Sequence, residues 1–323
     1  MKDKIYFLFP GQGAQYPGMG IDLKELSPET GGNEKVKRLF SLASEIAERD
    51  MADLITNSSP EILKRTDISQ PAITLVNMAA MACLEEIGIK PAGCAGFSLG
   101  EYSALAAAGV ISEEDCLFLV TKRGIAMQAA IDRIPPGPSA PGMAAVMGLP
   151  QEKVEALIAE WRNDGLTELN AANFNSSRQT VVSGSAEALE EAEKRFKKAG
   201  ARRFFRLQVA GPYHSPFMKT AAEEFDVYLN KVIFSDPEIP LFSNVSGRQI
   251  HSGAEAKSLA RMHILEGVRW TSEEAAISLM EPEALIEAGP GKVLQGLWRD
   301  TGSEVPCYAA GTAEEIKSLR ELL

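Results

Sequence analysis

Apolar residues along the chain follow two different spacings, and each spacing predicts a different kind of element. Short apolar runs bounded by Gly or Pro are typical of buried strands, whereas apolar residues three or four positions apart predict amphipathic helices. The predicted strands span 5–9, 92–97, 240–244 and 284–288, and the predicted helices span 35–48, 72–87, 99–109, 113–132 and 216–231. Because strands and helices alternate, we predict an α/β fold with a mostly parallel sheet covered on both faces.

The middle of the chain departs from this alternation. A dense cluster of Pro and Gly at 135–142 marks a boundary. The elements expected after it are a strand at 143–147, a helix at 151–163, strands at 167–174 and 179–183, a helix at 186–199 and a strand at 203–209. This order is that of a ferredoxin-like unit. We therefore expect a small ferredoxin-like subdomain, 134–209, inserted into a large α/β domain formed by 1–133 and 210–323.

Composition and charge exclude several classes of protein. The chain has 323 residues, 45% of them apolar and 24% charged, which is ordinary for a globular enzyme. We find no apolar run of about 18 residues, so no membrane span is expected. The apolar run at 5–9 is too short for a secretory signal, and we expect a cytoplasmic protein. The net charge of −11 argues against nucleic acid as a partner, and the four cysteines lack metal-site spacing, so no metal is expected.

A serine motif stands between a predicted strand and a predicted helix. Residues 96–100 read Gly-Phe-Ser-Leu-Gly, which matches G-x-S-x-G with Ser98 at its centre. In this context the motif favours a sharp turn that exposes the serine hydroxyl, and the Leu99 N–H at the helix start is a candidate oxyanion donor. A plain strand–turn–helix connection is the alternative interpretation.

A serine nucleophile needs a base, and the chain has three histidines. His214 lies in a turn-rich stretch after the last strand of the predicted insert, a natural place for a catalytic side chain. His251 lies in a polar loop and is expected at the surface. His263 lies in a helix-like stretch, where it is either structural or flanks the site. The residues alone favour His214.

Several segments together resemble the malonyl-CoA:acyl carrier protein transacylase family, which includes the stand-alone acyltransferases of fatty-acid and polyketide synthesis. They run in order along almost the whole chain: 9–15 (FPGQGAQ), 70–72 (QPA), 96–104 (GFSLGEYSA), 123–124 (RG), 173–176 (NFNS), 214–216 (HSP) and 289–294 (GPGKVL). The resemblance implies an α/β-hydrolase-like core with a ferredoxin-like insert, in agreement with the pattern above.

The resemblance also implies roles for individual residues. Ser98 is expected to be the nucleophile, His214 its base, and the backbone N–H groups of Gln12 and Leu99 the oxyanion hole. Backbone carbonyls are expected to orient His214 in place of a carboxylate. No cofactor is implied, because the coenzyme A thioester is a substrate. The residues expected around the substrate are Phe97, Arg123, Met127, Asn173 and Asn175.

Arg123 lies on an otherwise apolar helix face. The helix begins with a capping pattern at Ser112, and Arg123 shares one face with Cys116, Val120 and Met127. A guanidinium there is costly unless it meets an anion. An internal salt bridge or a side chain that reaches out to water would satisfy it. The resemblance instead implies that Arg123 binds the free carboxylate of a malonyl group.

Three features depart from the family pattern. Phe97 stands before the serine where the family usually has histidine, which leaves the acyl selectivity open. His263 stands seven residues before Trp270, where the family often has glutamine. Its backbone carbonyl is expected to hold His214, and assistance in catalysis is an alternative role for its ring. Residues 27–34 look like a loop extension.

A basic cluster interrupts the acidic chain within the predicted subdomain. It is interpreted either as a solvated helix end or as a docking face for an acidic carrier protein or for the phosphates of coenzyme A. The docking candidates are Lys194, Lys197, Lys198, Arg202 and Arg203.

These observations predict an enzyme that transfers a malonyl group from coenzyme A, through an acyl-serine, to the phosphopantetheine thiol of an acyl carrier protein. The pathway, fatty-acid or polyketide, is left open, and a monomer is expected. One alternative is a hydrolase of the same fold that clears acyl groups from carrier proteins. A second is a non-catalytic carrier-binding scaffold, which would leave Ser98, His214 and Arg123 together unexplained.

Overall fold

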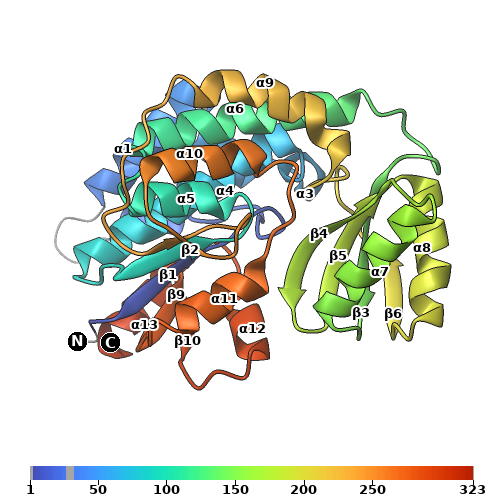
Figure 1. Cartoon of the computed structure of the whole chain (residues 1–323). Coiled ribbons are helices and arrows are strands. Elements are labelled where there is room, and N and C mark those ends of the chain that lie inside the picture. Colours follow the sequence, from blue (N-terminus) through green and yellow to red (C-terminus); the bar gives the residue numbers. More distant parts are fainter. Residues whose placement is uncertain (1–2, 27–32, 323) are drawn as a thin grey trace.

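The computed structural model describes residues 3–26 and 33–322, which form two sheets (Figure 1). The larger sheet has six strands in the order β10-β9-β1-β2-β7-β8, and every neighbouring pair is parallel except β7 and β8. Its strands are β1 (Ile5–Phe9), β2 (Gly93–Gly96), β7 (Leu241–Phe242), β8 (Gln249–Ile250), β9 (Ala284–Glu287) and β10 (Cys307–Ala309). The predicted α/β fold with a mostly parallel sheet is confirmed.

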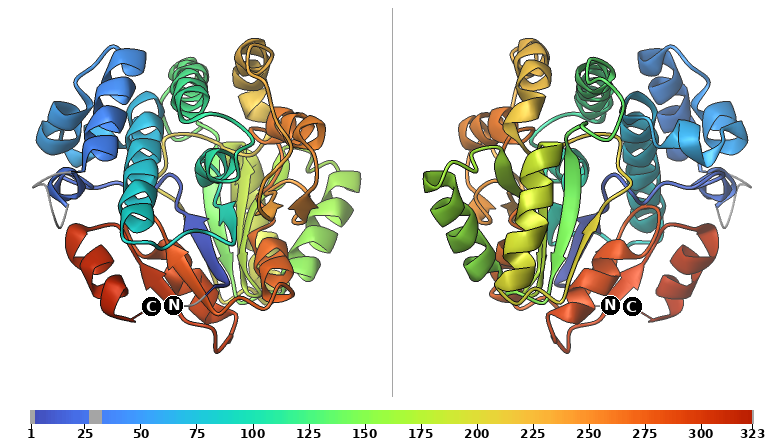
Figure 2. Two further views of the ribbon diagram at one scale, coloured as in Figure 1. Left: turned by 90° about the vertical axis from the view of Figure 1, so that its left-hand side faces the viewer. Right: turned by 90° about the vertical axis from the view of Figure 1, so that its right-hand side faces the viewer.

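Strand β1 shows why the strands of this sheet are continuous apolar runs in the sequence. Phe7 and Phe9 belong to the core on one face of the sheet, and Tyr6 and Leu8 belong to the core on the other face. The first core includes residues of α1 (Glu34–Ala47), α4 (Thr66–Glu86), α5 (Gly100–Ala107), α6 (Glu113–Asp132), α9 (Lys219–Leu229) and α10 (Gly253–Met262). The second contains Trp270 of α11 (Trp270–Ser278) and Trp298 of α12 (Val293–Asp300). Perpendicular views show the sheet between these helices (Figure 2).

The helix boundaries agree with those predicted from the sequence where the N-terminal cap is strong. The Ser112 hydroxyl accepts the Asp115 N–H, and α6 spans the predicted 113–132. Helix α4 begins at Thr66 instead of 72 and contains Pro71, because the Thr66 N–H is satisfied by Gln128 of α6 at 2.9 Å. The predicted helices did not include α2 (Met51–Asn57), α3 (Pro60–Leu63), α11, α12 and α13 (Ala313–Leu322), and α10 was predicted only as a helix-like stretch around His263. The expected loop extension at 27–34 falls largely outside the described residues.

The second sheet is antiparallel, in the order β4-β5-β3-β6. Its elements follow one another as β3 (Gly142–Met147), α7 (Gln151–Asn163), β4 (Leu169–Ser176), β5 (Gln179–Gly184), α8 (Ala186–Lys198) and β6 (Arg203–Arg206). This is the ferredoxin-like arrangement that the pattern predicts. Helices α7 and α8 cover one face, where their apolar residues pack on Ala144, Val146 and Val182. The other face carries Met143 and Val181 and lines a cavity.

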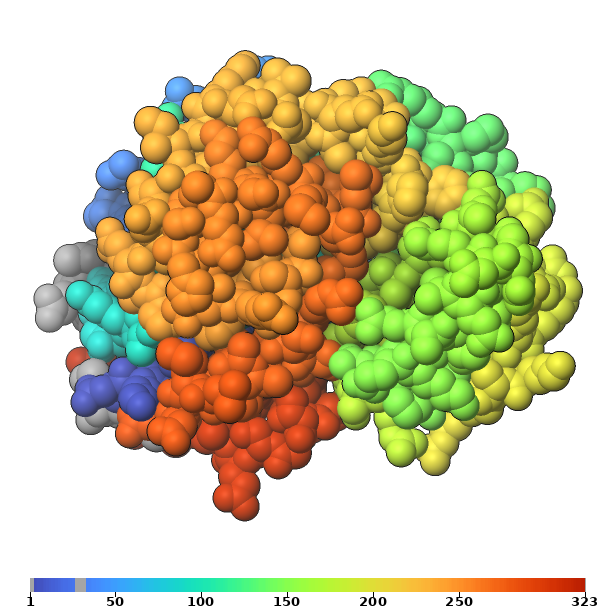
Figure 3. Space-filling model, viewed as in Figure 1, coloured from blue at the N-terminus to red at the C-terminus, as the bar shows by residue number. Residues whose placement is uncertain are grey.

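The small sheet is joined to the large domain by backbone hydrogen bonds as well as by the chain. The Phe174 N–H donates to the Val268 carbonyl, and the Val268 N–H donates to the Ala172 carbonyl, both at 2.9 Å. These bonds fix β4 against the segment that follows α10. A furrow lined by residues of both parts runs between them at the surface (Figure 3). Of the helices described, none combines the length and the apolar character that crossing a membrane requires.

Candidate active site

Ser98 occupies a strained turn between β2 and α5. Its φ is +50°, in the left-handed region that residues with a side chain rarely adopt. The flanking glycines make the turn possible: a Cβ at Gly100 would lie 2.0 Å from the Phe9 carbonyl oxygen, and one at Gly96 would lie 2.0 Å from the backbone of Gly100. The motif therefore has glycine on both sides because the backbones cross at contact distance. The turn presents the serine hydroxyl to the cavity.

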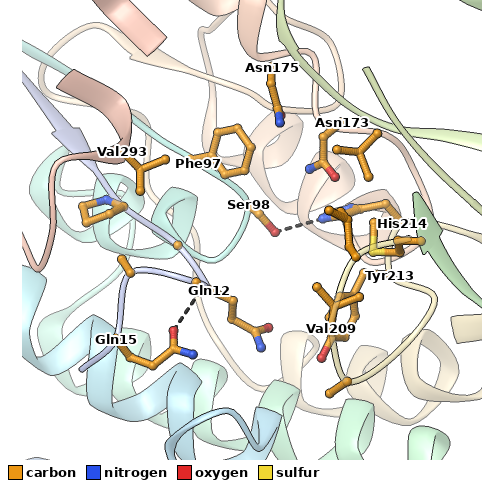
Figure 4. A pocket seen from close by; sticks show the side chains of 18 of the residues that line it. Gln12, Gln15, Phe97, Ser98, Asn173, Asn175, Val209, Tyr213, His214 and Val293 are labelled. Atoms are coloured by element: carbon orange, nitrogen blue, oxygen red, sulfur yellow. Dashed lines mark hydrogen bonds between the residues drawn. The ribbon is translucent and has the colours of Figure 1, made fainter. Parts of the chain in front are cut away.

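His214 lies 116 positions after Ser98 in the sequence and contacts its hydroxyl. It lies between β6 and the short helix Pro216–Met218, with φ of +53°, and its Nε2 is 2.9 Å from the Ser98 Oγ (Figure 4). Its Nδ1 faces two carbonyl oxygens, that of Glu266 at 2.8 Å and that of His263 at 3.1 Å. Nδ1 therefore carries the proton and Nε2 accepts from the serine. The prediction that backbone carbonyls, including that of His263, hold this ring is confirmed.

The environment keeps His214 neutral. Burial is the main cause that lowers its pKa, to about 4, and the positive charge of Arg123 lowers it further, while the two carbonyls act in the opposite direction. At neutral pH the ring is therefore a free base that can accept the Ser98 proton.

Two backbone N–H groups that lack a partner in the described chain belong to the turns that meet beside the serine. A Cβ at Gly11 would lie 2.2 Å from the Phe97 carbonyl oxygen and 3.4 Å from the Leu99 nitrogen, so the two turns pack against each other. Within the described residues, neither the Gln12 nor the Leu99 N–H donates a hydrogen bond. The Gln12 side chain, in contrast, is fixed by Ser69 at 3.2 Å and Gln70 at 3.1 Å. Two oriented donors are thus free to meet an oxyanion.

Asn244 clamps the serine turn, and the sequence analysis missed it. Its Oδ1 accepts the Ser98 N–H and its Nδ2 donates to the Gly96 carbonyl, both at 2.6 Å. Nδ2 also donates to Glu273 at 2.9 Å, and the Asn244 N–H donates to Glu101 at 2.7 Å. A signal existed, because Asn244 lies two residues beyond the carboxyl end of strand β7, where functional side chains of parallel sheets gather.

The two carboxyl groups bound to Asn244 are buried. Burial raises the pKa of Glu101 to about 8, against the smaller opposing effects of the Asn244 N–H and Arg123. Burial also raises the pKa of Glu273 well above its usual range. At neutral pH both groups are therefore largely protonated, and they hold the turn without adding negative charge under the serine.

Arg123 is buried without a counter-ion. It is 1% exposed, and no carboxylate of the described chain forms an ion pair with it. Its Nη2 lies 3.3 Å from the His263 Nδ1, its guanidinium lies 5.5 Å from the centre of the Tyr102 ring, and its Nε and Nη1 have no partner. Neither an internal salt bridge nor a side chain that reaches water therefore accounts for Arg123.

The cavity above these residues has a volume of about 540 Å³. Of the predicted substrate residues, Phe97, Met127, Asn173 and Asn175 line it, whereas Arg123 lies beneath its wall. Figure 4 shows the amides of Asn173 and Asn175 directed into the cavity, opposite Gln12. Phe97 packs edge-on against Trp270, with ring centres 5.4 Å apart. The remaining wall, not predicted from the sequence, is mostly apolar and includes Leu207, Val209, Tyr213, Val293 and Leu297.

The remaining predicted residues lie apart from this cavity. Lys194 and Lys197 are on α8, on the sheet face away from the cavity, and pair with Glu190 at 3.2 Å and Glu193 at 2.5 Å. Lys198 ends the same helix, and Arg202 directly precedes β6. Arg203 pairs with Met147 across the strands, which places it on the cavity-facing side of the sheet.

The other histidine and the cysteines take no part in the site. His251 is exposed. All four cysteines are free thiols, and burial raises the pKa of Cys94 and Cys116. In the part of the chain that the structure describes, no group of three His, Cys, Asp or Glu side chains is placed to hold a metal ion.

A serine in a strained turn, a neutral histidine on its hydroxyl and two free N–H groups define an enzyme that forms an acyl-serine. The chain belongs to the acyl transferase domain family, which matches residues 6–320, and it is an acyltransferase.

Named relatives resemble the chain over nearly its full length. It is 37% identical over 315 residues to the malonyl CoA-acyl carrier protein transacylase of Bacillus subtilis (strain 168), covering 97% of this chain and 95% of that protein. A structure of the same transacylase from Coxiella burnetii is 30% identical with a TM-score of 0.89 and covers 99% of this chain and 98% of the other. A malonyl-transacylase in complex with a type II PKS acyl-carrier protein is 32% identical with a TM-score of 0.88, covering 99% of this chain and 100% of the other.

Proposed function

We propose that this acyltransferase moves a malonyl group from coenzyme A to the phosphopantetheine thiol of an acyl carrier protein. The observation that carries the choice of acyl group is Arg123, a buried cation with two unpaired nitrogen atoms close to His214. A guanidinium in such a place is stabilised by an anion, and a carboxylate matches its fork of donors. The malonyl group supplies a free carboxylate, which a neutral acyl group lacks.

The first half-reaction loads the serine. His214 Nε2 takes the Ser98 proton as the oxygen attacks the thioester carbonyl, and the oxyanion accepts hydrogen bonds from the Gln12 and Leu99 N–H groups. The carbon–sulfur bond then breaks, and His214 returns its proton to the leaving thiolate. The products are malonyl-Ser98 and coenzyme A.

The second half-reaction repeats these steps with the carrier thiol. His214 takes the thiol proton, the sulfur attacks the acyl-serine, and the proton passes to the Ser98 oxygen as its bond to carbon breaks. Every group in both steps comes from the protein and the two substrates, so the reaction as proposed uses no metal or other cofactor.

Met127 and the cavity-facing amides complete the proposed substrate site. Met127 lies four residues after Arg123 on α6 and lines the cavity, and its flexible thioether can move to let a carboxylate reach the guanidinium. Asn173 and Asn175 face the same space, and the Asn175 Oδ1 is unpaired. We propose that these amides bind the amide groups of the pantetheine arm.

The surroundings of the site support three further proposals. Arg203, on the cavity-facing side of the small sheet, is the docking candidate best placed for the carrier or the phosphates of coenzyme A. A single chain supplies all the site residues named above, which supports a monomer as the active unit. Free, mostly buried thiols fit a reducing compartment such as the cytoplasm.

The intact mass of the protein after brief incubation with malonyl-CoA, and separately with acetyl-CoA, tests this proposal. We expect a malonyl adduct on the wild type, no adduct on Ser98→Ala, and a loading rate at least about 100-fold lower on Arg123→Ala, because the carboxylate loses a buried charged partner. Acetyl loading is expected to be slow in both the wild type and Arg123→Ala.

Two outcomes contradict the proposal. Retained malonyl labelling of Ser98→Ala would show that Ser98 is not the nucleophile. Free malonate appearing faster than malonyl transfer to a carrier protein would identify a hydrolase.

A further inference from the structure

His263 contacts three different parts of the site with three different groups. It ends α10 and is 1% exposed. Its main-chain carbonyl accepts from His214 at 3.1 Å, and its ring Nδ1 lies 3.3 Å from the Arg123 Nη2. Its ring Nε2 lies 3.4 Å from the Asn244 Oδ1 and 3.5 Å from the Glu101 Oε2. Only the carbonyl contact is independent of the side chain.

The contacts of the ring fix its protonation. A guanidinium can only donate, so Nδ1 must accept from Arg123. The proton of the neutral ring is then on Nε2, which faces the oxygens of Asn244 and Glu101. Burial, together with the charge of Arg123, holds the pKa of His263 well below its ordinary value, in keeping with a neutral ring.

The same ring connects Arg123 to the serine turn. The Asn244 Oδ1 that faces the His263 Nε2 also accepts the Ser98 N–H at 2.6 Å. A continuous chain of contacts therefore runs from the guanidinium, through His263 and Asn244, to the backbone of the nucleophile. The distance between the acyl carboxylate and the reacting carbonyl is fixed within the acyl group, so the two binding points need a fixed separation.

We propose that the His263 ring is a positioning residue that orients Arg123 towards the acyl carboxylate and thereby sets the preference for a dicarboxylic acyl group. The inference rests on the proposed function and deepens it. Arg123 has several rotatable bonds, and ordering it at the moment of binding would weaken affinity. With Nη2 held by the ring, Nε and Nη1 are placed in advance and remain free.

A neutral acceptor suits this task better than a carboxylate. An aspartate or glutamate at this position would hold the guanidinium as firmly but would also neutralise the charge that attracts the substrate. The buried carboxyl group of Glu101, which lies nearby, does not neutralise it either, because burial raises its pKa to about 8. The imidazole therefore orients the cation and leaves its charge to the substrate.

Two substitutions of His263 separate the ring contact from the backbone contact, since both keep the carbonyl that holds His214. His263→Leu removes both ring nitrogens, and His263→Gln restores one acceptor and one donor. We expect kcat/KM for malonyl loading to fall about tenfold or more in His263→Leu and to stay within about threefold of wild type in His263→Gln. The loss of acetyl loading, which does not use the proposed carboxylate site at Arg123, is expected to be at least about threefold smaller than the loss of malonyl loading in His263→Leu. His263→Met provides a second apolar replacement.

A double-mutant cycle tests whether the ring acts through Arg123. In the Arg123→Ala background, His263→Leu is expected to cause no further loss of malonyl loading, because the residue that it positions is already gone. Three outcomes would each overturn the positioning role alone. They are equal losses of loading with malonyl-CoA and acetyl-CoA, additive effects in the cycle, and a loss in His263→Gln as large as that in His263→Leu. Unchanged malonyl loading in Arg123→Ala would instead overturn the proposed carboxylate site, and the positioning role with it.

Discussion

The two walls of the cavity differ in kind. The wall built on the large sheet holds Ser98, His214 and Asn244 in a network of short hydrogen bonds, with two residues in left-handed backbone conformations. The wall built on the small sheet offers Asn173, Asn175 and apolar side chains, and none of its cavity-lining residues is charged. The proposed chemistry is thus confined to one wall, and the other wall is the proposed binding surface for the substrate.

The difference reflects how each sheet is covered. The parallel sheet is buried on both faces, so its turns are fixed by packing and can hold strained residues in place. The antiparallel sheet is covered by helices on one face only, which leaves a complete sheet face for the cavity. Substitutions should therefore affect the chemical step on the first wall and substrate binding on the second.

The largest effect is expected on the base. His214→Ala should lower the rate of malonyl loading at least about 1,000-fold, because among the described residues no other side chain is hydrogen-bonded to the Ser98 hydroxyl to accept its proton. Quenched-flow intact mass measures this rate. His251→Ala, which changes an exposed histidine, is the matched control and should load at the wild-type rate. Loading by His214→Ala at more than a tenth of the wild-type rate would show that another group acts as the base.

The next effect concerns the clamp on the serine turn. Asn244→Ala should lower kcat about 10- to 100-fold, because the Ser98 N–H, the Gly96 carbonyl and Glu273 each lose a buried partner worth about 1–3 kcal/mol. The melting temperature should fall as well. Asn57→Ala, which removes an exposed asparagine bonded to Asp53, controls for loss of an amide. An unchanged kcat in Asn244→Ala would show that the turn holds its shape without the clamp.

The pH dependence of loading tests the electrostatic effect of burial and of Arg123 on His214, on the large-sheet wall. With the pKa of His214 near 4, kcat/KM for acetyl-CoA should be constant from neutral pH down to about pH 5 and fall below it as the base becomes protonated. Removing the charge in Arg123→Ala should move this acid limb to higher pH, since that charge lowers the pKa. If kcat/KM of Arg123→Ala instead began to fall at a lower pH than that of the wild type, the result would contradict the conclusion that the charge of Arg123 lowers the pKa of His214.

The same group links stability to pH. Between pH 4 and the ordinary value of 6.5, the unfolded chain binds more protons at His214 than the folded chain does. The contribution of His214 to the free energy of unfolding is therefore complete above that interval and decreases as the pH falls through it.

The smallest effects are expected on the small-sheet wall. Asn175→Ala should raise KM for malonyl-CoA about two- to fivefold and change kcat less than twofold, because the amide binds the ground state and the transition state alike. Asn170→Ala, on the same strand but outside the main cavity, should leave both constants near wild type. A fall in kcat with KM unchanged would break the proposed division between the two walls.

Much of the molecule was predictable because the signals are local. The alternating pattern predicted the parallel sheet, and the element order between 143 and 209 predicted the ferredoxin-like unit. Ser98 and His214 stood out because a strained turn requires glycines at fixed spacing and because histidines are few. Helices α11 to α13 were not predicted, since their apolar positions are spread over short elements and their form depends on packing against the sheet.

The sequence by itself determined the fold class and the Ser98 turn, and it singled out His214 as the proposed base. These inferences depend on short-range spacing, on close backbone approaches that only glycine permits and on the small number of histidines. Only the tertiary structure decided that Asn244 holds the serine, that Glu266 supplies a second carbonyl to His214, and that His263 lies on Arg123. These contacts join residues that are 52 to 146 positions apart. Their partners come together only when the parallel strands align their carboxyl ends, a geometry that no local pattern records.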